Sequence, residues 1–215
     1  MGYTERMTDQ PSEFVPPGAR LSPSTARNRQ PILDELSIRL APDARVLEVA
    51  SGAGEHAVFV TSALPGVRWQ PTDPDPEALA SIAAWRDHAD LANLAQPLRL
   101  DAADPATWPP GPFEAVVCIN MIHISPWAST LGLMAGAGRV LAPGGRLFLY
   151  GPYIEAEVAT APSNLAFDES LKARNPAWGL RDLAQVKAAA SGAGLGFRER
   201  FAMPANNLIV IFEKP

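Results

Sequence analysis

"ARVLEVASGAGEHAVFV", residues 44–60, has the pattern of a strand, a turn with two glycines and a helix. Gly52, Gly54 and Ala57 fit G-x-G-x-x-A, one form of the dinucleotide-binding fingerprint. Glycines at such a turn let a ligand approach the backbone without meeting a Cβ atom. Glu48 lies on the strand just before the turn, where its carboxylate would repel a pyrophosphate. The stretch therefore predicts a nucleotide-like ligand that accepts a negative neighbour.

Strands and helices alternate along the rest of the chain. The expected strands are apolar or β-branched runs, at 45–50, 67–73, 97–103, 114–120, 145–151, 197–204 and 206–215. The expected helices carry apolar residues at helical spacing, at 24–40, 55–64, 76–91, 127–141 and 180–194. The tight connection between the last two strands forces an antiparallel final pair. We therefore expect an α/β fold: a single-domain, doubly wound, Rossmann-like, mostly parallel seven-stranded sheet with an antiparallel final strand.

The chain of 215 residues has the size of one domain. Residues 1–20 are polar and rich in proline, so we expect a flexible N-terminal arm before a domain at 21–215. The segment 152–179 contains several prolines and follows a strand, so we expect an irregular loop on the substrate side.

Composition and charge narrow the class of partner. The formal net charge is −5 and the isoelectric point about 5.2, which gives no broad attraction to nucleic acid or to an anionic membrane. No run is long and apolar enough for a membrane span or a secretory signal, so a cytoplasmic protein is expected. The single cysteine cannot form an intramolecular disulfide or a cysteine-rich metal site, and the three histidines lack metal-ligand spacing. No metal is therefore expected.

Carboxylates follow two of the expected strands. Asp73 ends the second, and Asp101, followed by Ala102, ends the third. The first is suited to ribose hydroxyls and the second to an adenine amino group. NAD and S-adenosylmethionine (SAM) both meet these requirements, but SAM carries an ammonium and a sulfonium in place of phosphates. Glu48 and the antiparallel final pair therefore favour SAM.

With these observations in place, the sequence resembles the class I SAM-dependent methyltransferases over roughly residues 25–215. "LEVASGAGEHA" is similar to the first motif of that family, "PTDPDP" to the second, "LDAAD" to the third and "FEAVVCINMIHI" to the fourth. "GRVLAPGGRLFLYGPY" is similar to the helix, turn and strand that follow. More narrowly, "SPSTARNRQPIL", "WQPTD", "INMIHISPW" and "GPY" resemble the methyltransferase-like 26 family, which has no settled substrate.

The strand ends and the resemblance together imply a set of site residues. Cofactor contacts are expected from the first helix, the glycine turn and the strand ends, at Arg27, Asn28, Glu48, Ala50, Gly52, Gly54, Asp73, Asp101, Ala102 and Asn120. Ala50 departs from the family pattern, which has glycine there. The resemblance implies a lid role for Arg27, on the SAM carboxylate or on a substrate anion.

Two residues are expected to have catalytic roles. We expect His123 and Tyr153 to face one pocket beside the SAM methyl group, with Arg27 closing it. A histidine after the fourth strand either serves as a general base or bonds a backbone carbonyl, and the sequence leaves both open.

The prediction is an enzyme that transfers a methyl group from SAM to a small-molecule acceptor and releases S-adenosylhomocysteine (SAH). The N-P-P-Y type motif of amino-directed DNA methyltransferases is missing, because Met121 follows Asn120. Two alternatives stay open. One is an NAD(P)-dependent oxidoreductase, and the other is a SAM-binding or interaction module without catalysis.

Overall fold

The computed structural model describes residues 15–215, and one sheet organises them. Its strands are β1 (Arg45–Val49), β2 (Arg68–Asp73), β3 (Leu98–Arg99), β4 (Phe113–Ile119), β5 (Leu141–Gly151), β8 (Gly196–Met203) and β9 (Asn207–Glu213). The helices are α1 (Thr25–Ser37), α2 (Glu55–Ala63), α3 (Pro76–Ala89), α4 (Trp127–Val140), α5 (Pro162–Arg174) and α6 (Leu183–Gly192). Short elements complete the order: β6 (Tyr153–Ile154), β7 (Arg181–Asp182), and the 3-10 turns η1 (Pro105–Thr107) and η2 (Pro204–Asn206).

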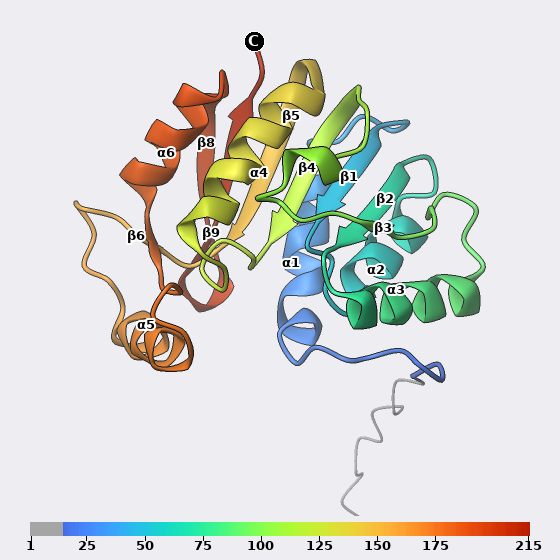
Figure 1. Ribbon diagram of the computed structural model, residues 1–215, viewed down its shortest axis with the longest axis horizontal. Coiled ribbons are helices and arrows are strands. Elements are labelled where there is room, and N and C mark those ends of the chain that lie inside the picture. Colours follow the sequence, from blue (N-terminus) through green and yellow to red (C-terminus); the bar gives the residue numbers. More distant parts are fainter. Residues whose placement is uncertain (1–14) are drawn as a thin grey trace, which may run out of the picture.

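The strand order is β3-β2-β1-β4-β5-β9-β8 (Figure 1). β1 pairs in parallel with β2 and with β4, whereas β9 runs antiparallel to both of its neighbours, β5 and β8. Only η2 joins β8 to β9, which leaves no room for a crossover helix. The expected doubly wound, mostly parallel seven-stranded sheet with one antiparallel strand is confirmed.

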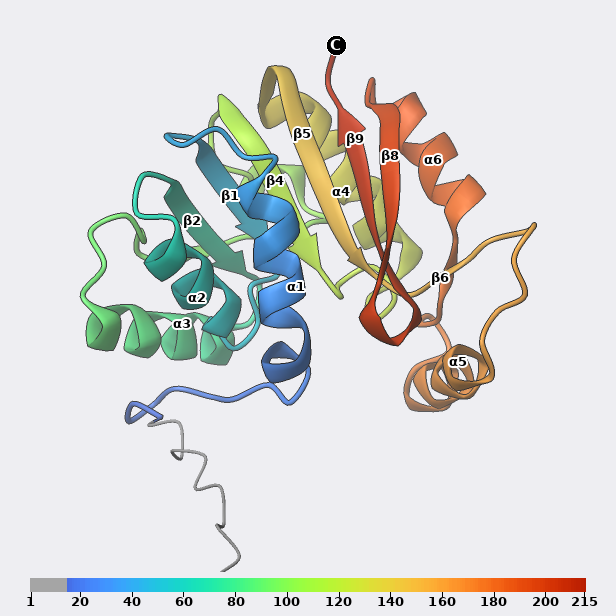
Figure 2. The ribbon, with the colours of Figure 1, turned by 180° about the vertical axis from the view of Figure 1, so that it is seen from behind.

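Helices cover both faces of the sheet (Figures 1 and 2). Neighbouring residues of a strand point to opposite faces, so Leu47 packs with α4 and α6 while Val46 packs with α1 and α2. β4 is buried on both sides, which explains its nearly continuous apolar sequence. The two apolar layers fix the positions of the strand ends, where the candidate site lies.

Two elements differ from the sequence-based expectation. β3 covers only Leu98–Arg99 of the strand expected at 97–103. The segment 152–179, expected to be irregular, contains the 13-residue helix α5. Pro162 stands in the first turn of α5, where a missing N–H costs nothing, so this proline starts a helix instead of preventing one.

The expected N-terminal arm is described only in part, since residues 1–14 lie outside the described residues. The remainder runs along α3, where the Arg20 N–H donates to Ser81 Oγ at 2.8 Å and Trp85 Nε1 donates to the Arg20 carbonyl at 2.9 Å. Between residues 15 and 215, no helix combines the length and apolar character needed to cross a membrane.

Candidate functional site

The turn between β1 and α2 uses three residues with left-handed backbone. Ala50, Gly52 and Gly54 have φ angles of 61°, 58° and 92°. A Cβ on Gly54 would lie 2.9 Å from Ile82 Cα, so this glycine lets α3 pack against the turn. A Cβ on Gly52 would meet nothing within 4 Å, so this glycine borders open space. The turn therefore has one packing glycine and one glycine that leaves backbone accessible to a ligand.

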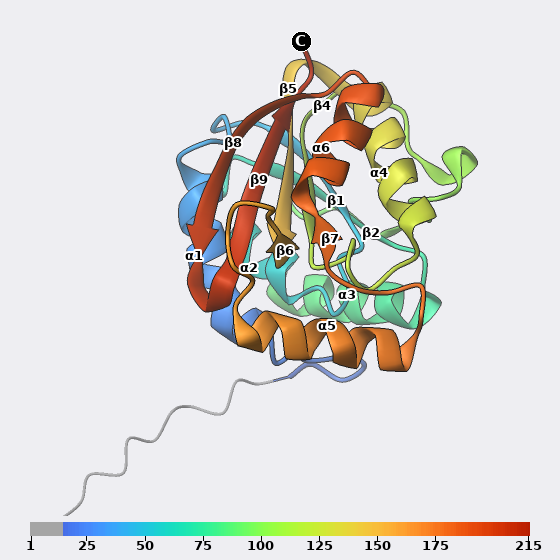
Figure 3. The same cartoon turned by 90° about the vertical axis from the view of Figure 1, so that its left-hand side faces the viewer.

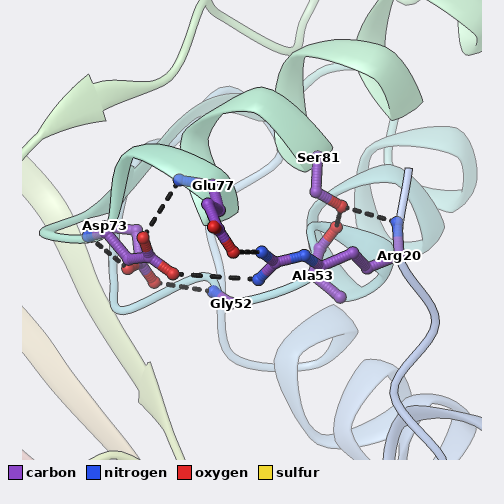
Figure 4. Close-up of polar contacts among 7 residues, drawn as sticks. Arg20, Gly52, Ala53, Asp73, Glu77 and Ser81 are labelled. Atoms are coloured by element: carbon purple, nitrogen blue, oxygen red, sulfur yellow. Dashed lines mark hydrogen bonds and ion pairs between the residues drawn. The ribbon is translucent and has the colours of Figure 1, made fainter. Parts of the chain in front are cut away.

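Asp73 links this turn to the end of β2 (Figure 4). Its Oδ2 accepts the Gly52 N–H at 2.9 Å, and its Oδ1 accepts the Asp75 N–H at 3.0 Å. Burial raises the pKa of Asp73, and the two backbone bonds act against that rise. A carboxylate offers about four acceptor positions, so two remain for a ligand at the open side of Gly52.

A third segment reaches the same turn from before α1. Arg20 pairs with Glu77 and lies 3.7 Å from Asp75, both at the start of α3. The backbone N–H of Arg20 donates to Ser81 Oγ, and this hydroxyl donates in turn to the Ala53 carbonyl at 2.7 Å. Figure 4 shows this chain of bonds beside the Asp73 carboxyl. The segment before α1 is therefore fastened to the glycine turn, which the sequence pattern did not indicate.

Glu48 lies below the turn and does not reach its open side. Its side chain is 1% exposed, and its carboxyl accepts Trp69 Nε1–H at 3.0 Å and bonds Ser51. Burial raises the pKa of Glu48, which favours the neutral acid over a charged partner for an ammonium. The structure therefore places Glu48 as a support of the turn.

The end of β3 lies beside the end of β2, because Asp73 pairs with Arg99. Asp101 follows two residues later, is partly exposed, and accepts the Ala103 N–H at 2.9 Å. Ala102 is buried, and its carbonyl accepts Trp108 Nε1–H at 3.3 Å. Asp101 therefore lies on the accessible side of this edge, whereas the Ala102 side chain belongs to the core.

A hollow of about 730 Å³ opens beyond β4 and β5, between α1 and α5. It combines charged, polar and aromatic side chains from five parts of the chain. They include Ser22, Ser24, Arg27, Asn28, Asn120, His123, Ile124, Tyr150, Asn164, Phe167, Arg174 and Asn207. Asn120 stands at its floor with a φ of 62°, and its N–H donates to the Tyr150 carbonyl at 2.8 Å. The structure thus brings Arg27, Asn28, Asn120 and His123 together, as expected.

A buried polar chain forms one wall of this hollow. His56 Nε2 lies 2.8 Å from Asn28 Oδ1, and the Asn28 side chain bonds the Tyr150 hydroxyl. Burial, with the nearby Arg29 guanidinium, lowers the pKa of His56 to about 4, so its imidazole is neutral near pH 7. The amide oxygen can only accept, so Nε2 donates to it, and the amide nitrogen then donates to the Tyr150 oxygen. The Tyr150 hydroxyl hydrogen is left free for a ligand.

His123 lies at the opposite wall. It is 3% exposed, its ring meets the Phe167 ring edge-on with centroids 5.7 Å apart, and its Nδ1 has no hydrogen-bond partner among residues 15–215. Burial, with Arg181 nearby, lowers the pKa of His123 to about 4. Because Nδ1 is itself buried, beside Gly151, the neutral imidazole lines the hollow with the rest of its ring, and at this pKa it is a weak base.

The structure corrects the expected position of Tyr153. It is buried among residues of the α4 and α6 face, and its hydroxyl has no hydrogen-bond partner in the described part of the chain. It lines a separate hollow of about 210 Å³ with Glu155 and Arg200. Tyr150 packs on the α1 and α2 face, because residues three apart in extended backbone point to opposite faces of the sheet. His123 and Tyr153 therefore do not share a pocket, and Tyr150 stands where Tyr153 was expected.

Sequence reasoning missed Arg20, His56 and Tyr150. Tyr150 ends β5, so the strand-end argument that selected Asp73 could have found it. His56 and Arg20 carried no comparable signal, because each acts through residues distant in the sequence.

Comparisons with known proteins agree with this geometry. A family model described as "Protein of unknown function (DUF938)" matches residues 19–214. An O-methyltransferase family protein from Burkholderia thailandensis has a TM-score of 0.75 and 17% identity, over 89% of this chain and 57% of that protein. The S-adenosylmethionine-dependent methyltransferase SibL has a TM-score of 0.75 and 21% identity, over 89% and 56%. An O-methyltransferase family 2 protein from Planctomyces limnophilus DSM 3776, solved with apigenin, has a TM-score of 0.73 and 20% identity, over 89% and 60%.

At these identities the likeness shows a shared fold, the Rossmann-like fold of class I methyltransferases. The chain spans less than two thirds of the length of each of these three proteins.

Proposed function

The chain belongs to the DUF938 family of proteins of unknown function, and we propose that it is a SAM-dependent methyltransferase acting on a small molecule. The fold supports this proposal, because its solved neighbours include a methyltransferase that depends on S-adenosylmethionine. The complex of another neighbour with apigenin supports a small-molecule acceptor. The proposal includes the narrower likeness to the methyltransferase-like 26 family. It also includes a cytoplasmic location and no nucleic-acid or membrane partner.

One observation carries the proposal: the open space over Gly52 next to a carboxylate that still has free acceptor positions. An adenosine placed there would lie against bare backbone, with its ribose hydroxyls on Asp73. Asp101, on the accessible side of the neighbouring strand end, would accept from the adenine amino group. No phosphate-binding arginine or lysine is needed by this arrangement, which suits SAM better than NAD.

The methionine end of the cofactor would then extend toward Asn120, at the floor of the large hollow. Asn28 and Arg27 come from α1 on one side of it. Glu48 and Ala50 hold the turn in shape from below and within it. In this proposal Gly54 contributes by packing and Ala102 by its position in the core.

When bound, SAM supplies a methyl group on a sulfonium, which is already a good leaving group. The protein must therefore align the acceptor with that methyl group in a site shielded from water. His123 lines the hollow, so its ring would contact the acceptor and help to hold the attacking atom in place. With a pKa of about 4, this imidazole orients better than it removes protons at neutral pH.

The test is turnover with methyl-labelled SAM across a library of small hydroxyl, amine and carboxylate acceptors. The proposal predicts release of SAH together with label on one class of acceptor. Replacing His123 by Asn keeps a polar group and should lower turnover while SAH affinity stays nearly unchanged. A protein that binds SAH but labels nothing in the library would instead be a binding module without catalysis.

A further inference from the structure

We infer that the large hollow between α1 and α5 takes a small organic anion, held between the arginines of the two helices. The inference rests on the proposed function, because it names the chemical class of the methyl acceptor. Figure 3 shows α5 running beneath the ends of the strands. The hollow receives residues from both helices and from the ends of β4 and β5.

The charge of the lining carries the inference. Arg27 and Arg174 line the hollow, and none of its lining residues is an aspartate or a glutamate. Among residues 15–215, neither arginine forms an ion pair with a carboxylate. The whole chain carries a formal net charge of −5, so this positive hollow stands out from an acidic protein. Unpaired guanidinium groups around a concave surface are suited to carboxylates and phosphates.

Arg174 is positioned by its own helix. Its Nε donates to the Ser170 carbonyl at 3.4 Å, and its guanidinium lies 5.6 Å from the centre of the Trp178 ring. These contacts leave the terminal nitrogens of the guanidinium as donors toward the hollow. Arg174 therefore provides a charge that belongs to the acceptor side, away from the glycine turn.

Neutral donors point to the same class of ligand. Ser22 and Ser24, just before the 13-residue helix α1, line the hollow, and the Ser24 side chain does not cap the N–H groups of the helix. The positive end of a helix favours an anion. On the other wall, the chain from His56 through Asn28 leaves the Tyr150 hydroxyl hydrogen available. Each of these groups can donate a hydrogen bond to an anionic oxygen.

The walls define the rest of the ligand. Phe167 and Ile124 are partly exposed at 36% and 41%, and both line the hollow together with the His123 ring. Flat apolar surfaces of this kind pack against a planar or aromatic body. The expected ligand is therefore a compact molecule with an apolar ring and at least one carboxylate or phosphate.

The test compares charged and neutral probes of nearly equal shape by calorimetry, with SAH-loaded and with ligand-free protein. The probes are 4-hydroxybenzoate, phenyl phosphate and the neutral 4-hydroxybenzamide. We expect 4-hydroxybenzoate or phenyl phosphate to bind at least about tenfold more tightly than the amide, which corresponds to roughly 1.4 kcal/mol. Whether the carboxylate or the phosphate binds better assigns the anionic group.

Variants locate the effect. Arg174→Gln should reduce the preference for the anion at least about fivefold, while SAH affinity stays unchanged. The matched control is Arg198→Gln, which removes an exposed arginine outside the hollow and should leave the preference intact. Equal binding of amide and anions, no binding of either anion at millimolar concentration, or an unchanged preference in Arg174→Gln would each overturn the inference. Failure of SAH to bind would refute the proposed function. The anion preference is also measured on ligand-free protein, so its failure is distinguishable from the failure of SAH binding.

Discussion

Replacing Gly52 by alanine separates the backbone requirement of the glycine turn from its contact with the cofactor. Gly52 has a φ of 58°, and a Cβ there would meet no protein atom within 4 Å. The substitution therefore adds backbone strain without a clash. A non-glycine residue in the left-handed region costs about 1–2 kcal/mol. For a chain of this size, that lowers the melting temperature by roughly 2–8 °C.

Gly144 gives a matched control. Its φ is 76°, a Cβ there also meets nothing within 4 Å, and it lies in β5 near Lys214, away from the hollow and the turn. Gly144→Ala should lose about the same stability as Gly52→Ala. Only Gly52→Ala places a methyl group in the space proposed for the adenosine.

The assay is SAH titration by calorimetry, with circular dichroism to show that both variants are folded. Gly144→Ala should bind SAH like the parent. Gly52→Ala should bind at least about tenfold more weakly, a loss of roughly 1.4 kcal/mol. A folded Gly52→Ala variant with the affinity of the parent would refute the reasoning, because the open side of the turn would then not be the cofactor site.

Three further predictions concern residues around the turn and the hollow. Ala50→Gly should raise the free energy of unfolding by about 1 kcal/mol in urea, because φ at this position is 61°; a less stable variant would contradict this. Burial raises the pKa of Glu48, so the folded state binds more protons and stability falls as pH rises above the ordinary value of 4.5. Glu48→Gln should therefore gain stability relative to the parent between pH 4 and pH 8 in urea titrations, and a constant difference would argue against it. His56→Leu leaves the Asn28 amide oxygen without its partner and should lower the free energy of unfolding by about 1–3 kcal/mol, measured by thermal unfolding. His56→Gln keeps a donor and should lose less. Equal losses in the two variants would show that this hydrogen bond is not the cause.

Much of the fold could be predicted because local patterns and packing agree. The apolar run of β4 and the glycines after β1 each specify their own element, and the short connection before Asn207 forces the antiparallel strand. The sequence pattern does not predict α5, because several prolines within 152–179 indicate an irregular segment. Proline breaks a helix in its interior but is compatible with its first turn, and the position in the helix decides which applies.

Apart from Arg27 and Asn28, which the family resemblance supplied, the candidate site was predictable only where strand ends define it. Asp73 and Asn120 follow from that rule, because parallel strands end at the same edge of the sheet. The expected position of Tyr153 is wrong because Tyr153 follows Leu149 and Gly151 in the alternation of the extended chain, on the face opposite Tyr150. His56 depends on Asn28, 28 residues away, and a single sequence contains no signal for such a pair.

Direct titration of the purified protein with SAH, and separately with NAD, tests the central claim most directly. The account predicts binding of one SAH per chain, a loss of affinity of about 1.5–3 kcal/mol on removing the Asp73 carboxylate, and no measurable heat with NAD. Binding of NAD without binding of SAH would contradict it and would assign the glycine turn to a dinucleotide.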